Sequence, residues 1–185
     1  MNNIQPAIFF VPVIVLILVI VLYFYLMKNT THKKVFKRLV LIIAVLAFLL
    51  NFIWEVLQLP LYKGSSYDLE HIAFCALASV ADALMVLLLY LCFALINKKP
   101  FWAQDMGFPQ VFALMIIGGI GAIIAEMAHT AAGNWAYADS MPMLPLVNVG
   151  LSPVLQFLFL PALIYYVSFL LLKKISKNET QLINP

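Results

Sequence analysis

Five long apolar runs constrain this chain more than any other feature of its sequence. Each run has about 20 residues or more with few charges, which is the length that an α-helix needs to cross the hydrocarbon core of a bilayer. Only 10% of the 185 residues are charged and the mean hydropathy is +1.02, whereas a soluble domain carries about 25% charged residues. We therefore predict an all-α fold, a polytopic membrane helix bundle with five transmembrane helices.

The runs also set the expected domain organisation. We predict a single bundle domain at residues 1–175 and a disordered cytoplasmic tail at residues 176–185. The expected spans lie at about residues 7–27, 39–59, 72–96, 108–130 and 151–172.

Lysine and arginine residues gather on one side of the predicted membrane. Ten of the 11 follow the first, third or fifth span, and only Lys63 follows the second. Because cytoplasmic loops are enriched in these residues, we expect the N-terminus outside and the C-terminus in the cytoplasm. The predicted location is a cell membrane, of the bacterial inner-membrane type. The basic residues form short clusters between apolar runs, so no nucleic-acid partner is expected.

The segment NFIWEVLQLPLY, residues 51–62, places polar side chains inside the second run. With a step of about 100° per residue, Asn51, Glu55 and Gln58 share one stripe with Ala44 and Ala47. Small and polar residues on one helix face favour packing against other helices over contact with lipid.

The third run has a similar face. His71, Cys75, Ala78 and Asp82 lie within about 60° of one another, with Asp82 about 16 Å deeper than His71. Asp82 is therefore expected near the middle of the bilayer.

The fourth run repeats the pattern with smaller residues. Gly118, Ala122, Ala125 and His129 form a stripe, and Glu126 lies on its flank. The small residues should allow another helix to approach closely.

The fifth run begins with Ser152 and Gln156 on one side. Pro161 lies inside this run and should free the carbonyl of Phe157 from its helical hydrogen bond. With the orientation set by the lysines, seven polar residues fall at the same, outer end: Glu55, Gln58, Glu70, His71, Glu126, His129 and Gln156. A charged side chain costs about 2.5–3.5 kcal/mol at the centre of a membrane helix, so such a cluster indicates function.

A loop follows the fourth run, with the sequence GNWAYADSMPMLPLVNVGLSP. Its proline and glycine residues exclude one continuous helix. Two interpretations are open: a lid or substrate channel over the polar end, lined by Trp135, Tyr137 and Asn148, or an apolar connector lying on lipid headgroups.

Three interpretations of the polar cluster are open. The first is a divalent metal site for Zn or Fe, because Glu126 and His129 have Glu-x-x-His spacing and His71 and Glu55 offer further ligands. No feature of the sequence requires a cofactor. The second is metal-free acid–base chemistry. The third is structural, with polar pairs that hold helices together.

The candidate residues follow from these interpretations. The catalytic candidates are Glu55, His71, Asp82, Glu126 and His129. The candidates for substrate binding are Asn51, Trp54, Gln58, Trp135, Tyr137, Asn148 and Gln156.

Three segments resemble a family of small, uncharacterised bacterial multipass membrane proteins. They are NFIWEVLQLPLY, HIAFCALASVADALM and GNWAYADSMPMLPLVNVGLSPVLQ. That resemblance implies a membrane location. More distantly, the pairs Trp54-Glu55 and Glu70-His71, with Glu126, are similar to the emopamil-binding (sterol isomerase) group. The resemblance to that group implies a small bundle that shifts a double bond by proton transfer in an apolar cavity.

We expect from these observations an integral membrane protein with an acidic and histidine-containing pocket near the outer face. Its expected function is acid–base chemistry, of an isomerase or hydrolase kind, on a lipid or isoprenoid, or the binding of such an apolar or amphipathic molecule. A small transporter or ion-coupled carrier is one alternative. A helper subunit of another membrane protein is the other.

Overall fold

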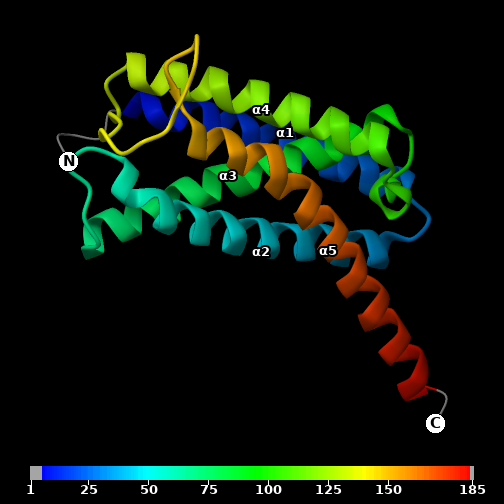
Figure 1. Cartoon of the computed structure of the whole chain (residues 1–185). Coiled ribbons are helices and arrows are strands. Elements are labelled where there is room, and N and C mark those ends of the chain that lie inside the picture. The colour runs from blue at the N-terminus through cyan, green and yellow to red at the C-terminus, as the bar shows by residue number, and fades with distance from the viewer. Residues whose placement is uncertain (1–5, 184–185) are drawn as a thin grey trace.

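The computed structural model describes residues 6–183, with side chains for residues 8–175. Five long helices dominate it (Figure 1): α1 Phe10–Asn29, α2 Lys33–Gln58, α3 Leu69–Ile96, α4 Phe108–Ala131 and α5 Leu151–Ile183. The chain is 79% helical, and all five helices are long and apolar enough to cross a membrane. The predicted all-α bundle is thus confirmed.

Short elements join the helices. Three are 3-10 helices, η1 Pro6–Phe9, η2 Leu59–Leu61 and η3 Trp102–Asp105. The connection between α4 and α5 contains an antiparallel hairpin of β1 Met143–Leu144 and β2 Val149–Gly150, with Met143 opposite Gly150. This connection has no α-helix, as its prolines predict.

Two helices extend well beyond the apolar runs that predict them, each by more than one turn at one end. α2 begins at Lys33 because Lys33, Lys34 and Lys37 form helix readily although they are not apolar. α5 reaches Ile183, beyond the predicted span end at residue 172. The tail predicted at residues 176–185 lies outside the residues whose side chains are described, and its disorder stays a prediction.

The helices pack in a defined order across the bundle (Figure 1). α2 packs against α3 on one side and α5 on the other, α4 packs against α5, and α1 packs against α3. We call the end with residues 62–68 and 132–150 the loop end, and the end with residues 30–32 and 97–107 the basic end. α5 therefore runs between α4 and α2 and can connect polar groups of both.

A close contact joins α4 to α5. A Cβ on Gly118 would lie 2.2 Å from the backbone oxygen of Phe157, so only glycine allows this approach. Pro161 has no N–H to bond that same oxygen, which leaves it available to the neighbouring helix. The sequence predicted the small residues of the fourth run and the proline of the fifth run separately. In the structure both features concern the backbone oxygen of Phe157.

An aromatic cluster fills the half of the bundle toward the basic end. The rings of Tyr90, Trp102 and Tyr165 pack with centroids 5.2 to 5.7 Å apart. Their polar atoms bond to backbone oxygens: Tyr165 donates to Val86 over 2.7 Å and Trp102 donates to Tyr90 over 3.1 Å. This half is therefore a closed core, and the polar cluster lies toward the loop end.

Candidate functional site

Gln156 of α5 is the centre of a polar network between three helices. Its side-chain nitrogen donates to Oδ1 of Asn51 on α2 over 2.8 Å and to Oδ2 of Asp82 on α3 over 3.0 Å. Its oxygen accepts from Nε2 of Gln58 over 3.4 Å. Gln156 and Asn51 are both 1% exposed, so these bonds replace those that water would make. The predicted stripe of α2 therefore faces α5.

The network continues along α2 toward the loop end. Nε2 of Gln58 donates to Oε1 of Glu55 over 2.8 Å, and Oε1 of Gln58 accepts from Oγ of Ser152 over 2.9 Å. The indole nitrogen of Trp54 donates to the same Oγ over 3.3 Å. Every one of these polar groups has a partner, which is the condition for placing them within a membrane bundle.

Two carboxyl groups meet in this network. Glu55 of α2 and Asp82 of α3 are close electrostatic neighbours, and both lie near Gln156. Two neighbouring carboxylates repel each other, and a proton on one of them relieves that repulsion. Both residues are only partly buried. The arrangement thus places two carboxyl groups, each able to exchange a proton, next to each other.

A third carboxyl group, that of Glu126, lies near this pair, toward the loop end. Glu126 of α4 is 8% exposed and is an electrostatic neighbour of both Glu55 and Asp82. Its Oε2 accepts hydrogen bonds from the indole nitrogen of Trp135, over 3.1 Å, and from the hydroxyl of Tyr137. The loop between α4 and α5 therefore holds Glu126 in place, and the three carboxyl groups come from three helices.

Two loops join to cover Glu126. The backbone of Tyr62 pairs with that of Tyr137, with Lys63 N–H donating to Ala136 O over 2.8 Å and Ala138 N–H donating to Leu61 O over 2.9 Å. We call these two paired loop segments, residues 61–63 and 134–138, the cover. Their backbones form a small sheet-like contact at the loop end. The two loops are thus fixed to each other by backbone bonds, and both interpretations of the loop stay predictions.

Tyr62 was not among the residues predicted for the site. Its ring packs on those of Trp135 and Tyr137, with centroids 6.3 and 5.7 Å away. Burial, and next the nearby charge of Glu126, raise the pKa of Tyr62 well above its usual value. One feature of the sequence could have indicated Tyr62: it is an aromatic residue directly after η2, the short helix with Pro60 that follows α2.

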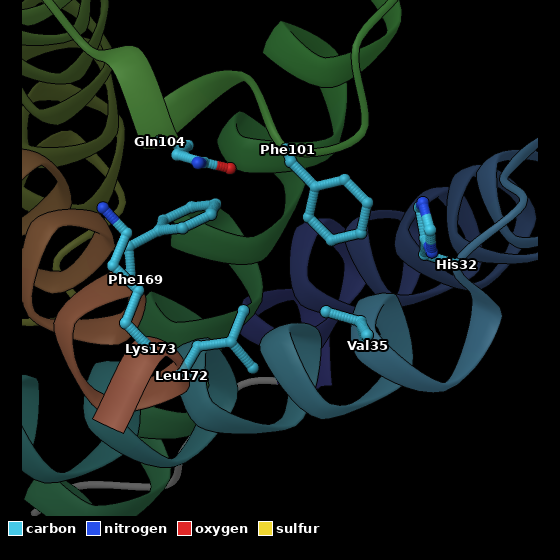
Figure 2. Close-up of a pocket in the computed structure, with 7 residues that line it drawn as sticks. All are labelled: His32, Val35, Phe101, Gln104, Phe169, Leu172 and Lys173. Atoms are coloured by element: carbon cyan, nitrogen blue, oxygen red, sulfur yellow. The ribbon is translucent and has the colours of Figure 1, made fainter. Parts of the chain in front are cut away.

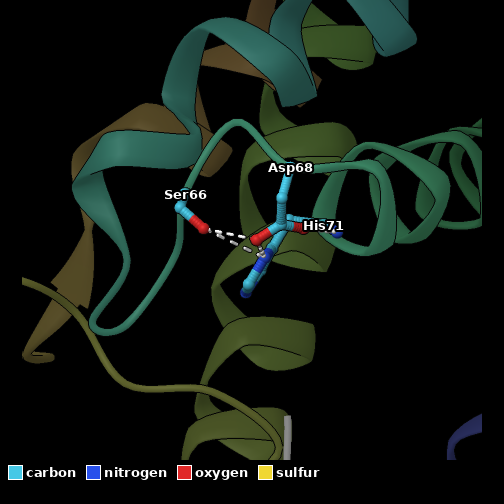
Figure 3. Close-up of polar contacts among 3 residues, drawn as sticks. All are labelled: Ser66, Asp68 and His71. Atoms are coloured by element: carbon cyan, nitrogen blue, oxygen red, sulfur yellow. Dashed lines mark hydrogen bonds and ion pairs between the residues drawn. The ribbon is translucent and has the colours of Figure 1, made fainter.

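His71 does not join this cluster through its described contacts, contrary to the expectation that it lies with Glu55 and Glu126. Its ring Nδ1 lies 2.8 Å from Oδ2 of Asp68 and 3.5 Å from Oγ of Ser66 (Figure 3). Asp68 also caps α3 by accepting from the His71 N–H over 2.9 Å. The Ser66 hydroxyl, followed by the His71 N–H and ring, holds the pKa of Asp68 below its usual range. A local helix cap therefore accounts for His71.

His129 contacts the cover and does not bond to Glu126. Its ring stacks on Trp135 with centroids 4.4 Å apart, and its Nδ1 accepts from the Asn134 amide over 2.8 Å. The Glu-x-x-His spacing of residues 126–129 thus places the two side chains against different partners. Within residues 8–175, no three His, Cys, Asp or Glu side chains are grouped so that they could hold a metal ion. The predicted set of Glu126, His129, His71 and Glu55 is not assembled.

Asn148 also lies apart from the carboxyl groups. It is exposed at the turn of the β1–β2 hairpin, where its φ of 51° is in the left-handed region that asparagine tolerates. A backbone requirement of the turn therefore explains this residue. Of the predicted binding residues, Asn51, Trp54, Gln58, Trp135, Tyr137 and Gln156 contact the network or Glu126.

Comparisons with known proteins do not assign this arrangement to a family. No protein-family model, no curated protein and no solved structure matches the chain.

Proposed function

We propose that this integral membrane protein is an enzyme that transfers protons to and from an apolar lipid or isoprenoid. One observation carries the proposal: the carboxyl groups of Glu55 and Asp82, from two helices, are close neighbours, and the buried amide of Gln156 lies beside both and donates to Asp82. A helix bundle held together by packing alone does not need adjacent carboxyl groups, because each costs several kcal/mol (about 2.5–3.5 at the bilayer centre).

The pair suits a reaction that needs no net proton. A protonated carboxyl group gives its proton to one carbon of a double bond, which leaves the positive charge on the other carbon. A carboxylate then takes a proton from the saturated carbon attached to that second carbon. The double bond has then shifted, and the pair holds one proton as before. Glu126 lies close enough to favour the cationic intermediate electrostatically or to return the proton.

The surroundings of the carboxyl groups indicate a substrate without phosphate. In the part of the chain that is described, the hydrogen-bond donors to Glu55, Asp82 and Glu126 are amides, an indole and a phenol, all of them neutral. A phosphorylated lipid would need Lys or Arg side chains to offset its charge. A neutral or cationic amphiphile fits three carboxyl groups better.

Deuterium exchange tests this proposal without knowledge of the substrate. Purified protein is incubated in D₂O with a total lipid extract, and deuterium at carbon positions is measured by mass spectrometry. We expect one lipid class to gain deuterium, and Glu55→Gln or Asp82→Asn to slow the gain by about 100-fold or more. Glu70→Gln is the matched control, because Glu70 is an exposed carboxylate at the same end of α3.

The proposal is wrong if no lipid exchanges faster with the protein than with the Glu55→Gln Asp82→Asn double variant. In that case the carrier and the helper subunit are the functions to test next. A carrier predicts proton uptake into liposomes that Glu126→Gln abolishes, whereas a helper subunit predicts no such uptake and a partner that co-purifies.

A further inference from the structure

A cleft lies at the basic end, opposite the carboxyl groups. It has a volume of about 300 Å³ and is formed by the start of α2, the segment around η3 and the far part of α5. Its lining residues are His32, Val35, Phe101, Gln104, Phe169, Leu172 and Lys173 (Figure 2).

The lining of the cleft combines apolar and polar groups in an ordered way. Figure 2 shows Lys173 and Gln104 toward one end of the cleft and His32 at the other, with the ring of Phe101 between them. Among residues 8–175, no carboxylate forms an ion pair with Lys173. The cleft thus offers a cation and hydrogen-bond donors beside an apolar surface.

The residues around the cleft carry positive charge, which favours an anionic ligand. α2 begins at its rim with Lys33 and Lys34 in the first turn, no acidic residue there and no side-chain cap. The start of a helix carries a partial positive charge, so cations in its first turn are unfavourable by themselves. The start of α2 thus adds to the positive charge around the cleft, and Lys173 is the cation that lines it.

We propose that this cleft binds an anionic phospholipid of the adjoining leaflet. The phosphate is bound by Lys173 and Gln104, and one acyl chain lies against Phe101, Phe169 and Leu172. A free phosphate would leave the apolar rings without a partner, and a neutral lipid would leave the basic rim uncompensated. Basic pockets between membrane helices on the cytoplasmic side are the type of site that binds anionic lipid headgroups.

Native mass spectrometry of the full chain in detergent tests the proposal. We expect dioleoyl phosphatidylglycerol to bind more tightly than dioleoyl phosphatidylcholine, which has the same acyl chains. Lys173→Gln should weaken the phosphatidylglycerol complex about fivefold, the effect of one basic residue at an anionic surface. Lys174→Gln is the matched control, because Lys174 is the next residue and does not line the cleft.

Three outcomes would overturn the proposal. Equal binding of the two lipids would exclude recognition of the anionic headgroup. Equal effects of Lys173→Gln and Lys174→Gln would show that binding depends on the general positive charge of this end. Full competition by glycerol phosphate at the concentration of the lipid would assign the cleft to a free phosphate compound. Lys173 is exposed, so its substitution leaves the fold intact, which size-exclusion chromatography verifies.

Discussion

At the scale of single residues, Gln156 connects groups that would otherwise be costly to bury. An amide has both donors and an acceptor, so one side chain can bond to an amide oxygen, a carboxyl group and another amide at once. Gln156 does this with Asn51, Asp82 and Gln58. Its burial at 1% exposure means that no water replaces these bonds when they are lost.

Replacement of Gln156 should therefore destabilise the bundle. We expect Gln156→Leu to lower the free energy of unfolding by about 1–3 kcal/mol, because Asn51 and Asp82 lose their donor while they remain between helices. Unfolding in mixed detergent and denaturant, followed by circular dichroism, measures the change. Ser140→Ala, in an exposed loop, is the control and should have almost no effect. Equal stability of the two variants would contradict the network.

Two tyrosines of the cover predict a loss of stability at alkaline pH. Burial is the largest cause that raises the pKa of Tyr62 and of Tyr137 above the usual value of 10, and Glu126 is the second. The folded protein thus binds the phenolic protons more tightly than the unfolded chain does. The contribution of these groups to stability is full below about pH 10 and is lost as the pH rises further.

Thermal unfolding at pH 8 to 11.5, in a detergent without ester bonds, measures this effect. We expect Tyr62→Phe and Tyr137→Phe each to reduce the decline of the melting temperature between pH 10 and 11.5. The control is Tyr25→Phe, since Tyr25 is 54% exposed on α1. A decline that is identical in all three variants would show that the cover does not bury these phenols.

The sequence predicted many residues of the cluster but not their partners. Asn51, Glu55 and Gln58 could be placed on one face because helical periodicity is a local property. Helical periodicity could not predict which residues His71 and His129 contact. His71 bonds to Asp68 and His129 stacks on Trp135, and both partners lie in turns whose course periodicity does not describe.

At the scale of elements, the contact between α4 and α5 sets the position of Glu126 above the carboxyl pair. Gly118 brings the two backbones together at the oxygen of Phe157, two turns along α4 from Glu126. If these helices moved apart, Glu126 would move away from Glu55 and Asp82. The glycine is therefore a positioning residue for the site.

Two glycines of α4 allow a matched test of this contact. We expect Gly118→Ala to destabilise the protein by about 1–3 kcal/mol, because the new methyl group would overlap the backbone oxygen of Phe157. Gly121→Ala meets nothing within 4 Å and should be neutral or stabilising by up to about 1 kcal/mol, since alanine favours a helix. Melting temperatures in detergent compare the two. A Gly118→Ala protein as stable as Gly121→Ala would exclude the close contact.

At the scale of the whole molecule, the two ends of the bundle differ in charge. Glu55 and Glu126 lie in the parts of α2 and α4 next to the loop end, and Asp82 lies in the middle of α3. The lysines of the α2 start and of α5 lie at the basic end. The aromatic core of Tyr90, Trp102 and Tyr165 separates the two groups. The three carboxyl groups and the lysines of the basic end thus lie on opposite sides of this aromatic core.

Cysteine labelling tests the predicted orientation of the bundle. In a chain with Cys75 and Cys92 replaced by alanine, we expect Ser140→Cys to react with a membrane-impermeant maleimide on intact cells. Lys98→Cys should react only after the membrane is permeabilised, because the basic end is expected in the cytoplasm. Both positions are exposed, so accessibility within the fold does not limit the reaction. Labelling with the opposite preference would invert the orientation.

By itself, the sequence determined that this protein is a bundle of five apolar helices and which helix faces are polar. Hydropathy and periodicity specify both, because each depends on residues near one another in the chain. Only the tertiary structure decided that Glu55 and Asp82 meet at Gln156 and that Tyr62 and Tyr137 join two loops over Glu126. It also decided that His71 bonds to Asp68, the residue that caps α3. These contacts depend on how the helices rotate and how the loops fold, and both result from packing between segments far apart in the sequence.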